Sequence, residues 1–103
     1  MNTENELRCS LDKLYEIAAD ARRRTIITVL LNADGEMTLD SLTSKVIVNQ
    51  DDLSAHKARF IEMELRHRYL PMFSESDFVE YDEEREVVRP RQELDRFSVI
   101  LPE

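Results

Sequence analysis

Basic side chains concentrate between residues 55 and 74 of an otherwise acidic sequence, where four of them stand against two glutamates. Such side chains bind phosphate and hydrogen-bond base edges in the major groove. We therefore predict that this stretch is a DNA-binding helix. Its candidate DNA-binding residues are Arg59, Arg66, His67 and Arg68. The alternative is a solvated helix face on which Glu62 pairs with Arg66 and Glu64 with Arg68, four residues apart.

A second basic cluster, Arg22, Arg23 and Arg24, opens an earlier predicted helix. Positive charge in the first turn of a helix opposes the helix dipole and is mildly unfavourable. This cost suggests a compensating partner, either DNA phosphate or the acidic segment later in the chain, so we include the three arginines among the candidate DNA-binding residues. The alternative is that they pair with acidic side chains within the molecule.

The sequence lacks the residue arrangements that are typical of enzymes. It has no Ser/His/Asp order, no glycine-rich phosphate loop and no HExxH-type metal spacing. His67 either touches phosphate or a base edge, or is a partly buried, hydrogen-bonded side chain. Cys9 is the single cysteine and cannot form an internal disulfide, so we interpret it as a small apolar residue. We expect a binding protein that is not an enzyme and uses no cofactor and no metal.

The charge balance bears on the environment of the protein. Its 103 residues carry a formal net charge of −8, and its 14 basic residues are mostly arginine. Many acids with few lysines are typical of cytoplasms at very high salt, where ions screen self-repulsion. An ordinary acidic protein is the alternative. No apolar run approaches the roughly 18 residues of a membrane span, and the polar start of the chain lacks a signal pattern. We expect a cytoplasmic protein with one domain.

Apolar spacing predicts three helices in the first half of the chain. Ser10 caps the first, Asp20 precedes the second, and Thr38 caps the third, with Asp40 in its first turn. Between the second and third, Gly35 suits a left-handed backbone and a short extended link follows. The predicted apolar positions are, in order, Leu11, Leu14 and Ala18; Ile26, Ile27, Leu30 and Leu31; and Leu39, Leu42 and Val46.

The longest helical pattern covers residues 53–74 and contains Pro71. Because proline lacks a backbone donor and clashes with the preceding turn, we predict a kink or a helix–turn–helix split near residues 68–70. Two runs of strand-forming residues, 78–81 and 86–89, flank a polar four-residue turn and predict a β-hairpin.

The predicted hairpin is strongly acidic. Between residues 75 and 86, seven acidic residues stand against one arginine. Phosphates repel such a segment, so either the hairpin stays away from DNA or the fold binds a protein instead. The tail after Pro90 is too apolar to remain in solvent, and we expect it to dock on the domain or on a dimer partner.

Several stretches resemble a family of small haloarchaeal winged-helix domains. They are residues 20–31, similar to its opening helix; residues 38–42, similar to the start of its second helix; residues 65–73, similar to a late helix in which a histidine-containing run meets Leu-Pro; and the Val-Glu-Tyr-Asp of residues 79–82, similar to its first wing strand. The resemblance covers roughly residues 12–90. It implies a winged helix-turn-helix fold, an archaeal source and a role in transcription regulation. Before the wing strand, Ser76-Asp77 replaces the usual Ala-Gly, and aspartate tolerates a left-handed backbone better than most residues.

Together these observations predict a mostly α-helical fold with a β-hairpin wing, of the winged helix-turn-helix class. We expect a flexible lead-in at residues 1–9, the domain at residues 10–90, and the docking tail at residues 91–103. The predicted function is a DNA-binding transcription regulator that binds double-stranded DNA as a homodimer and is adapted to high salt. The alternative is a winged-helix protein-protein interaction module that does not bind DNA. A contiguous positive face joining the two arginine clusters favours DNA, whereas a negative recognition face favours a protein partner.

Overall fold

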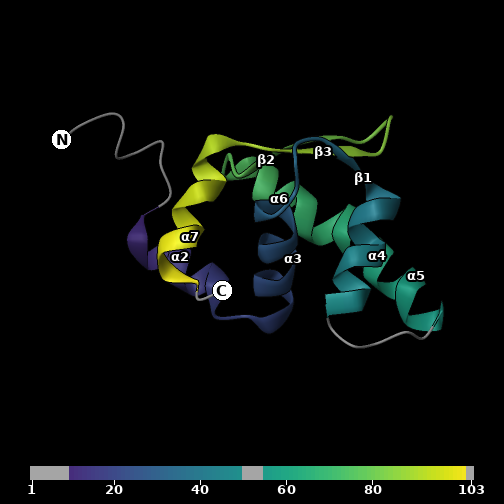
Figure 1. Cartoon of the computed structure of the whole chain (residues 1–103), viewed down its shortest axis with the longest axis horizontal. Coiled ribbons are helices and arrows are strands. Elements are labelled where there is room, and N and C mark those ends of the chain that lie inside the picture. Colours follow the sequence, from purple (N-terminus) through teal and green to yellow (C-terminus); the bar gives the residue numbers. More distant parts are fainter. Residues whose placement is uncertain (1–9, 50–54, 102–103) are drawn as a thin grey trace.

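The computed structural model describes residues 10–49 and 55–101 of the chain. The expectations for the lead-in and for Cys9 lie outside this part. The fold is mostly helical with a small three-stranded antiparallel sheet along one side (Figure 1). Its elements are α2 (Leu11–Ala18), α3 (Ala21–Leu31), β1 (Met37–Thr38), α4 (Leu39–Asn49), α5 (Ala55–Glu64), the π-helical turn η1 (Leu65–Tyr69), α6 (Leu70–Glu75), β2 (Val79–Asp82), β3 (Val87–Pro90), the 3-10 turn η2 (Gln92–Arg96) and α7 (Phe97–Ile100).

Three helices begin where side-chain oxygens accept hydrogen bonds from their first turns, which confirms the predicted starts. The Ser10 hydroxyl accepts from the Lys13 backbone N–H at 3.1 Å. The Asp20 carboxylate accepts from the Arg23 N–H at 3.0 Å, and the Thr38 hydroxyl accepts from the Ser41 N–H at 3.0 Å. Each cap satisfies a donor that has no partner within its own helix.

The three strands pair in the order β1-β3-β2. The predicted hairpin is present, but each strand lies one residue later than expected, so the four-residue turn is 83–86 and Asp82 lies opposite Val87. The predicted extended link is strand β1, which adds a third strand by pairing with β3. Asp77, just before β2, has a φ of 66°, so it adopts the left-handed backbone expected there. Glu86, just before β3, has a φ of 54°.

Pro71 does not split the long helix. The chain continues from α5 into α6 through η1, where the Leu70 N–H donates to the Leu65 carbonyl five residues earlier. This wider turn accommodates a residue that lacks an N–H and crowds the preceding turn. The wider turn also helps a row of buried residues to face the core. In a regular helix of 3.6 residues per turn, residues spaced four apart shift progressively around the helix, and the wider turn offsets this shift. The buried residues of this row are Ile61, Leu65, Tyr69 and Phe73.

The core lies between α3, the long helix and the sheet, and the tail closes one side of it. The Phe78 ring packs edge-on against Phe97 of α7, with ring centroids 4.9 Å apart. Leu94 and Phe97 are fully buried, so the tail docks on the domain itself. α7 lies beside α2 (Figure 1). One predicted core position is wrong: Leu11 is 55% exposed, and the buried face of α2 is Leu14, Ile17 and Ala18.

No helix in the described part of the chain has the length and apolar character needed to cross a bilayer.

Candidate nucleic-acid interface

The outward surface of α5 and η1 forms a ridge of exposed side chains. The outer ridge, as we call it, consists of Arg59, Phe60, Met63 and His67. Arg59, Met63 and His67 follow one another at four-residue spacing, so they share a helix face. Phe60 is 47% exposed and Met63 is 57% exposed. The ridge lies opposite the buried face of the same helix, and it is therefore open to a partner.

The outer ridge carries no carboxylate among its four residues. The two glutamates of α5 lie half-buried on either side of the ridge, and each pairs with an arginine of the same long helix. Glu62 accepts from Arg66, and Glu64 accepts from Arg68, both at 3.5 Å. These are the two ion pairs that the sequence offered as an alternative. In an acidic protein, this leaves a helix surface that is apolar and weakly basic.

Arg66 lies on the flank of the ridge that faces the hairpin. Besides Glu62, it forms an ion pair with Glu86 at the start of β3. Burial raises the pKa of the neighbouring Tyr81 hydroxyl above its ordinary value, and the charge of Arg66 partly opposes this shift. Arg66 therefore connects the long helix to the hairpin rather than pointing freely outward.

Arg68 lies on the opposite flank, which faces the start of α3. Its guanidinium stacks over the Tyr69 ring, 5.3 Å from the centroid. Burial raises the pKa of the Tyr69 hydroxyl, Asp20 raises it further, and the charges of Arg68 and Arg22 lower it. The charges of Arg22 and Arg68, one from each predicted basic cluster, therefore both act on this tyrosine.

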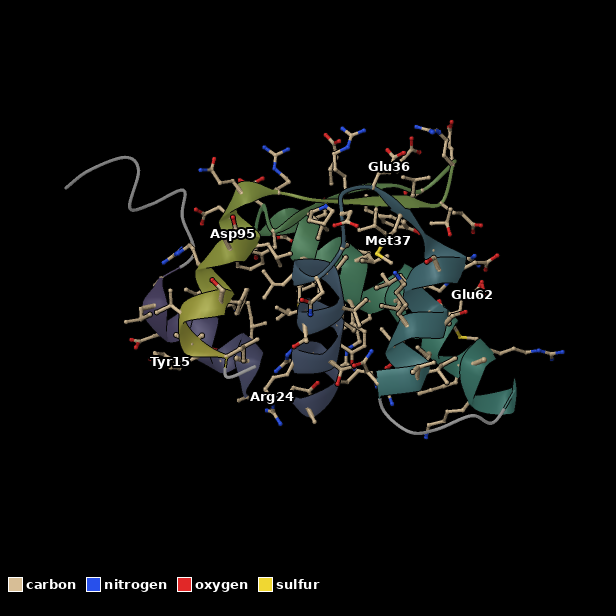
Figure 2. The ribbon with its side chains drawn as sticks, viewed as in Figure 1. Tyr15, Arg24, Glu36, Met37, Glu62 and Asp95 are labelled. Atoms are coloured by element: carbon tan, nitrogen blue, oxygen red, sulfur yellow. The ribbon has the colours of Figure 1, made fainter. Side chains whose placement is uncertain are left out.

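Arg23 and Arg24 cap the end of α2, a role that the sequence analysis did not anticipate. Arg23 Nε donates to the Ile17 carbonyl at 2.9 Å, and Arg24 Nη1 donates to the Ala18 carbonyl at 2.8 Å. The alternative that these arginines pair with acids does not hold for Arg23 and Arg24, because their side-chain hydrogen bonds go to backbone oxygens. The position is favourable because the carboxyl end of a helix attracts cations. Figure 2 shows Arg24 at the α2 end of α3.

The predicted site residues therefore separate into three groups. Arg59 and His67 are exposed on the outer ridge, and the exposure of His67 rules out the buried alternative. Arg66 and Arg68 flank the ridge, with Arg22 beside the latter. The remaining two arginines hold α2. Sequence analysis missed Phe60 and Met63, although both are large apolar residues that lie off the buried stripe of their helix.

The outer surface of the hairpin is a second candidate site, and it is acidic. A shallow hollow there is lined by carboxylates and two arginines. One of these, Arg89, spans the sheet by donating to Glu80 at 2.9 Å and to Glu36 at 3.0 Å. Within residues 10–49 and 55–101, no three carboxylates, histidines or cysteines are grouped so that they could hold a metal ion. The hollow suits a basic partner better than a phosphate.

No curated protein and no solved structure matches the chain. One family does match, described as "Domain of unknown function (DUF7344)", and the match covers residues 15–89. This range runs from α2 to β3 and includes the outer ridge, its two flanks and the hairpin. Because the match covers well over half of the sequence, the chain belongs to the DUF7344 family.

Proposed function

We propose that this chain is a DNA-binding transcription regulator of the winged helix-turn-helix type. The observation that carries the proposal is the outer ridge, a helix surface without a carboxylate on a protein of net charge −8. A DNA-binding helix must approach phosphates, which repel acidic surfaces. The ridge meets this requirement, and it projects from the side of the helix that the core leaves open.

The order of elements supports the same proposal. α3, α4 and the long helix are followed by the β2–β3 hairpin, and β1 pairs with β3. Three helices followed by a hairpin is the order of a winged helix. In such a domain, α4 and α5 form the helix-turn-helix and α5 enters the major groove. Fold alone does not establish function, so the proposal depends on the ridge.

The ion pairs of the flanking arginines are compatible with DNA binding. Arg66 is 37% exposed and Arg68 is 60% exposed at the side chain. Exposed ion pairs contribute between about 0 and 1 kcal/mol, so exchanging a glutamate for a phosphate costs little. Arg59 has no hydrogen bond or ion pair within the described part of the chain and is available directly.

We further propose that the protein acts as a homodimer adapted to high salt. Leu11 and Tyr15 on α2 are each 55% exposed, and Val99 on the adjacent α7 is 86% exposed. Figure 2 shows Tyr15 at the end of the molecule formed by α2 and α7. Exposed apolar patches of this kind mark interfaces, and two-fold symmetry is the commonest arrangement. Such a dimer would present two outer ridges to one duplex.

A second candidate function is that of a winged-helix module that binds another protein. The acidic hollow on the hairpin favours it, because that surface repels phosphate and attracts basic side chains. In this case the exposed Phe60 and Met63 would be covered by protein rather than by DNA. The two functions differ in whether DNA or protein covers the outer ridge, and one experiment distinguishes them.

The experiment is a selection of binding sites from random duplex DNA with the full chain, in dilute buffer and in molar KCl. The proposal expects a recurring motif, with weaker binding by Arg59→Ala. Arg89→Ala is the control, because it removes an exposed arginine of the sheet that pairs with Glu36 and Glu80 and lies away from the ridge. Failure to enrich any sequence at either salt concentration would overturn the DNA-binding proposal and favour a protein partner.

A further inference from the structure

We propose that Phe60 and Met63 read thymine methyl groups in the major groove, so that the chain selects A·T base pairs. This inference rests on the proposed DNA-binding function and goes further by naming the residues that determine the sequence. It follows from the side chains that the structure places at the centre of the outer ridge. They are apolar, although charged neighbours lie on both sides.

The ridge has the composition of a surface that reads methyl groups. Phe60 and Met63 are three residues apart and half-exposed, so both project from the face of α5 that would enter the groove. Each base pair shows a distinct pattern in the major groove, and the thymine C5-methyl is the apolar element of that pattern. Phenylalanine is among the side chains that contact it, and methionine adapts readily to such irregular apolar surfaces.

The flanking arginines of the helix are less well placed to read guanine than to contact phosphate, because Arg66 and Arg68 lie on either side of the ridge rather than at its centre. Bidentate recognition of guanine requires a guanidinium whose donors all point at the base edge. Arg66 is engaged by Glu62 and Glu86 on one flank. Arg68 is stacked on a tyrosine and paired with a glutamate on the other flank. Only Arg59 remains on the ridge itself, so most of the base reading falls to the apolar pair.

Charge identifies DNA, rather than a second copy of the chain, as the occupant of the ridge. Elsewhere the exposed apolar pair Leu11 and Tyr15 lies next to two exposed acids, Asp12 and Glu16. The ridge has Arg59 and His67 as its exposed polar residues, and the two glutamates beside it, Glu62 and Glu64, are only 33% and 25% exposed and pair with arginines. An acid-flanked apolar face does not fit a groove lined with phosphates, whereas the ridge does. Apolar contact also survives high salt, which screens phosphate attraction within about 3 Å at 1 M.

The test compares a selected duplex with a copy in which deoxyuridine replaces thymidine at single positions, which removes only the methyl group. Binding of the full chain is measured by fluorescence anisotropy. We expect a loss of about fourfold in affinity at each position that is read, the equivalent of roughly 0.8 kcal/mol for one buried methylene-sized group. Phe60→Ala and Met63→Ala should each become insensitive to the replacement at one thymine while still binding DNA.

Two controls make the outcome decisive. Val48→Ala truncates a comparably exposed apolar side chain on α4, and it should keep the wild-type ratio between the thymine and uracil duplexes. Replacing thymines outside the selected motif should have no effect. Motif binding with no loss on any uracil duplex would overturn methyl reading and leave the DNA-binding function standing. Absence of any selected motif would overturn both.

Discussion

Arg66 and Glu86 form an ion pair that joins the π-helical turn of the long helix to the hairpin. Glu86 has a left-handed backbone, and its carbonyl accepts a hydrogen bond at 2.9 Å from the Leu39 N–H at the start of α4. One residue thus links the hairpin to both helices of the proposed helix-turn-helix. Its carboxylate also occupies the donors of an arginine that lies beside the outer ridge.

Neutralising this carboxylate should strengthen DNA binding. Glu86→Gln removes an acidic charge near the ridge and releases Arg66 for phosphate. We expect affinity to rise by up to about fivefold, because an exposed ion pair contributes at most about 1 kcal/mol. Anisotropy titrations at two salt concentrations measure the change. Glu83→Gln with Glu84→Gln is the control, since these exposed turn residues have no ion pair with Arg66; it should leave affinity unchanged or raise it slightly. A weaker complex with Glu86→Gln would contradict this prediction.

Removing a cap of α2 should destabilise the protein. Arg23 donates to carbonyls of α2 at 2.9 and 3.2 Å. Hydrogen bonds from charged donors contribute about 1.5–3 kcal/mol when buried, and this side chain is only partly buried. We expect Arg23→Ala to lower the free energy of unfolding by about 1 kcal/mol in urea denaturation. Loss of DNA affinity at unchanged stability would instead place Arg23 at the DNA.

The stability of the fold should fall in strongly alkaline solution. The pKa values of Tyr69 and Tyr81 are raised above 10.0, chiefly because burial disfavours the phenolate. The folded state therefore prefers the neutral phenols, and this stabilisation is complete below pH 10 and lost as the pH rises above it. Urea midpoints between pH 8 and pH 11 measure the loss. Tyr69→Phe with Tyr81→Phe should flatten the curve, and an equally steep curve in this variant would contradict the assignment.

Salt should stabilise the fold if the protein is adapted to high salt. A net charge of −8 on 103 residues causes self-repulsion that ions screen. We expect thermal midpoints, followed by circular dichroism, to rise as KCl increases from dilute to multimolar. A flat midpoint with full cooperative folding in dilute buffer would contradict this adaptation.

The proposed dimer can be broken at α2. Light scattering of the wild-type chain at tens of micromolar in high salt should give the mass of a dimer, about twice 12.1 kDa. Tyr15→Glu places a charge in the exposed apolar patch and should give a monomer with an unchanged circular dichroism spectrum. A monomeric wild type would refute the dimer without bearing on the ridge.

Local rules predicted the parts of this fold that depend on neighbours in sequence. The caps at Ser10 and Thr38 and the presence of the hairpin follow from side-chain chemistry and from two strand-forming runs around a polar turn. The bounds of its strands, each one residue later than predicted, do not follow from these local rules. The pairing of β1 with β3 does not, because two residues at an edge carry too little pattern. The roles of Arg23 and Arg24 also escaped, since they act on the preceding helix rather than on their own.

The candidate site shows the same limit. The charges of Arg66 and Arg68 were apparent from the sequence, but their separation onto opposite flanks depends on what packs beside each one. Phe60 and Met63 were detectable in principle, because large apolar residues that lie off a buried stripe have no place in the core of a small domain. Charge alone does not identify them as candidates for DNA contact, because both are apolar.

If the outer ridge enters the major groove as proposed, its length limits how many base pairs each subunit can read. The ridge runs from α5 into the π-helical turn that follows directly on it. From Arg59 to His67 the ridge then extends about 12 Å at roughly 1.5 Å per residue. Base pairs are stacked about 3.4 Å apart. Each half of a palindromic operator would accordingly have a recognised core of about three or four base pairs, with the remaining positions open to variation.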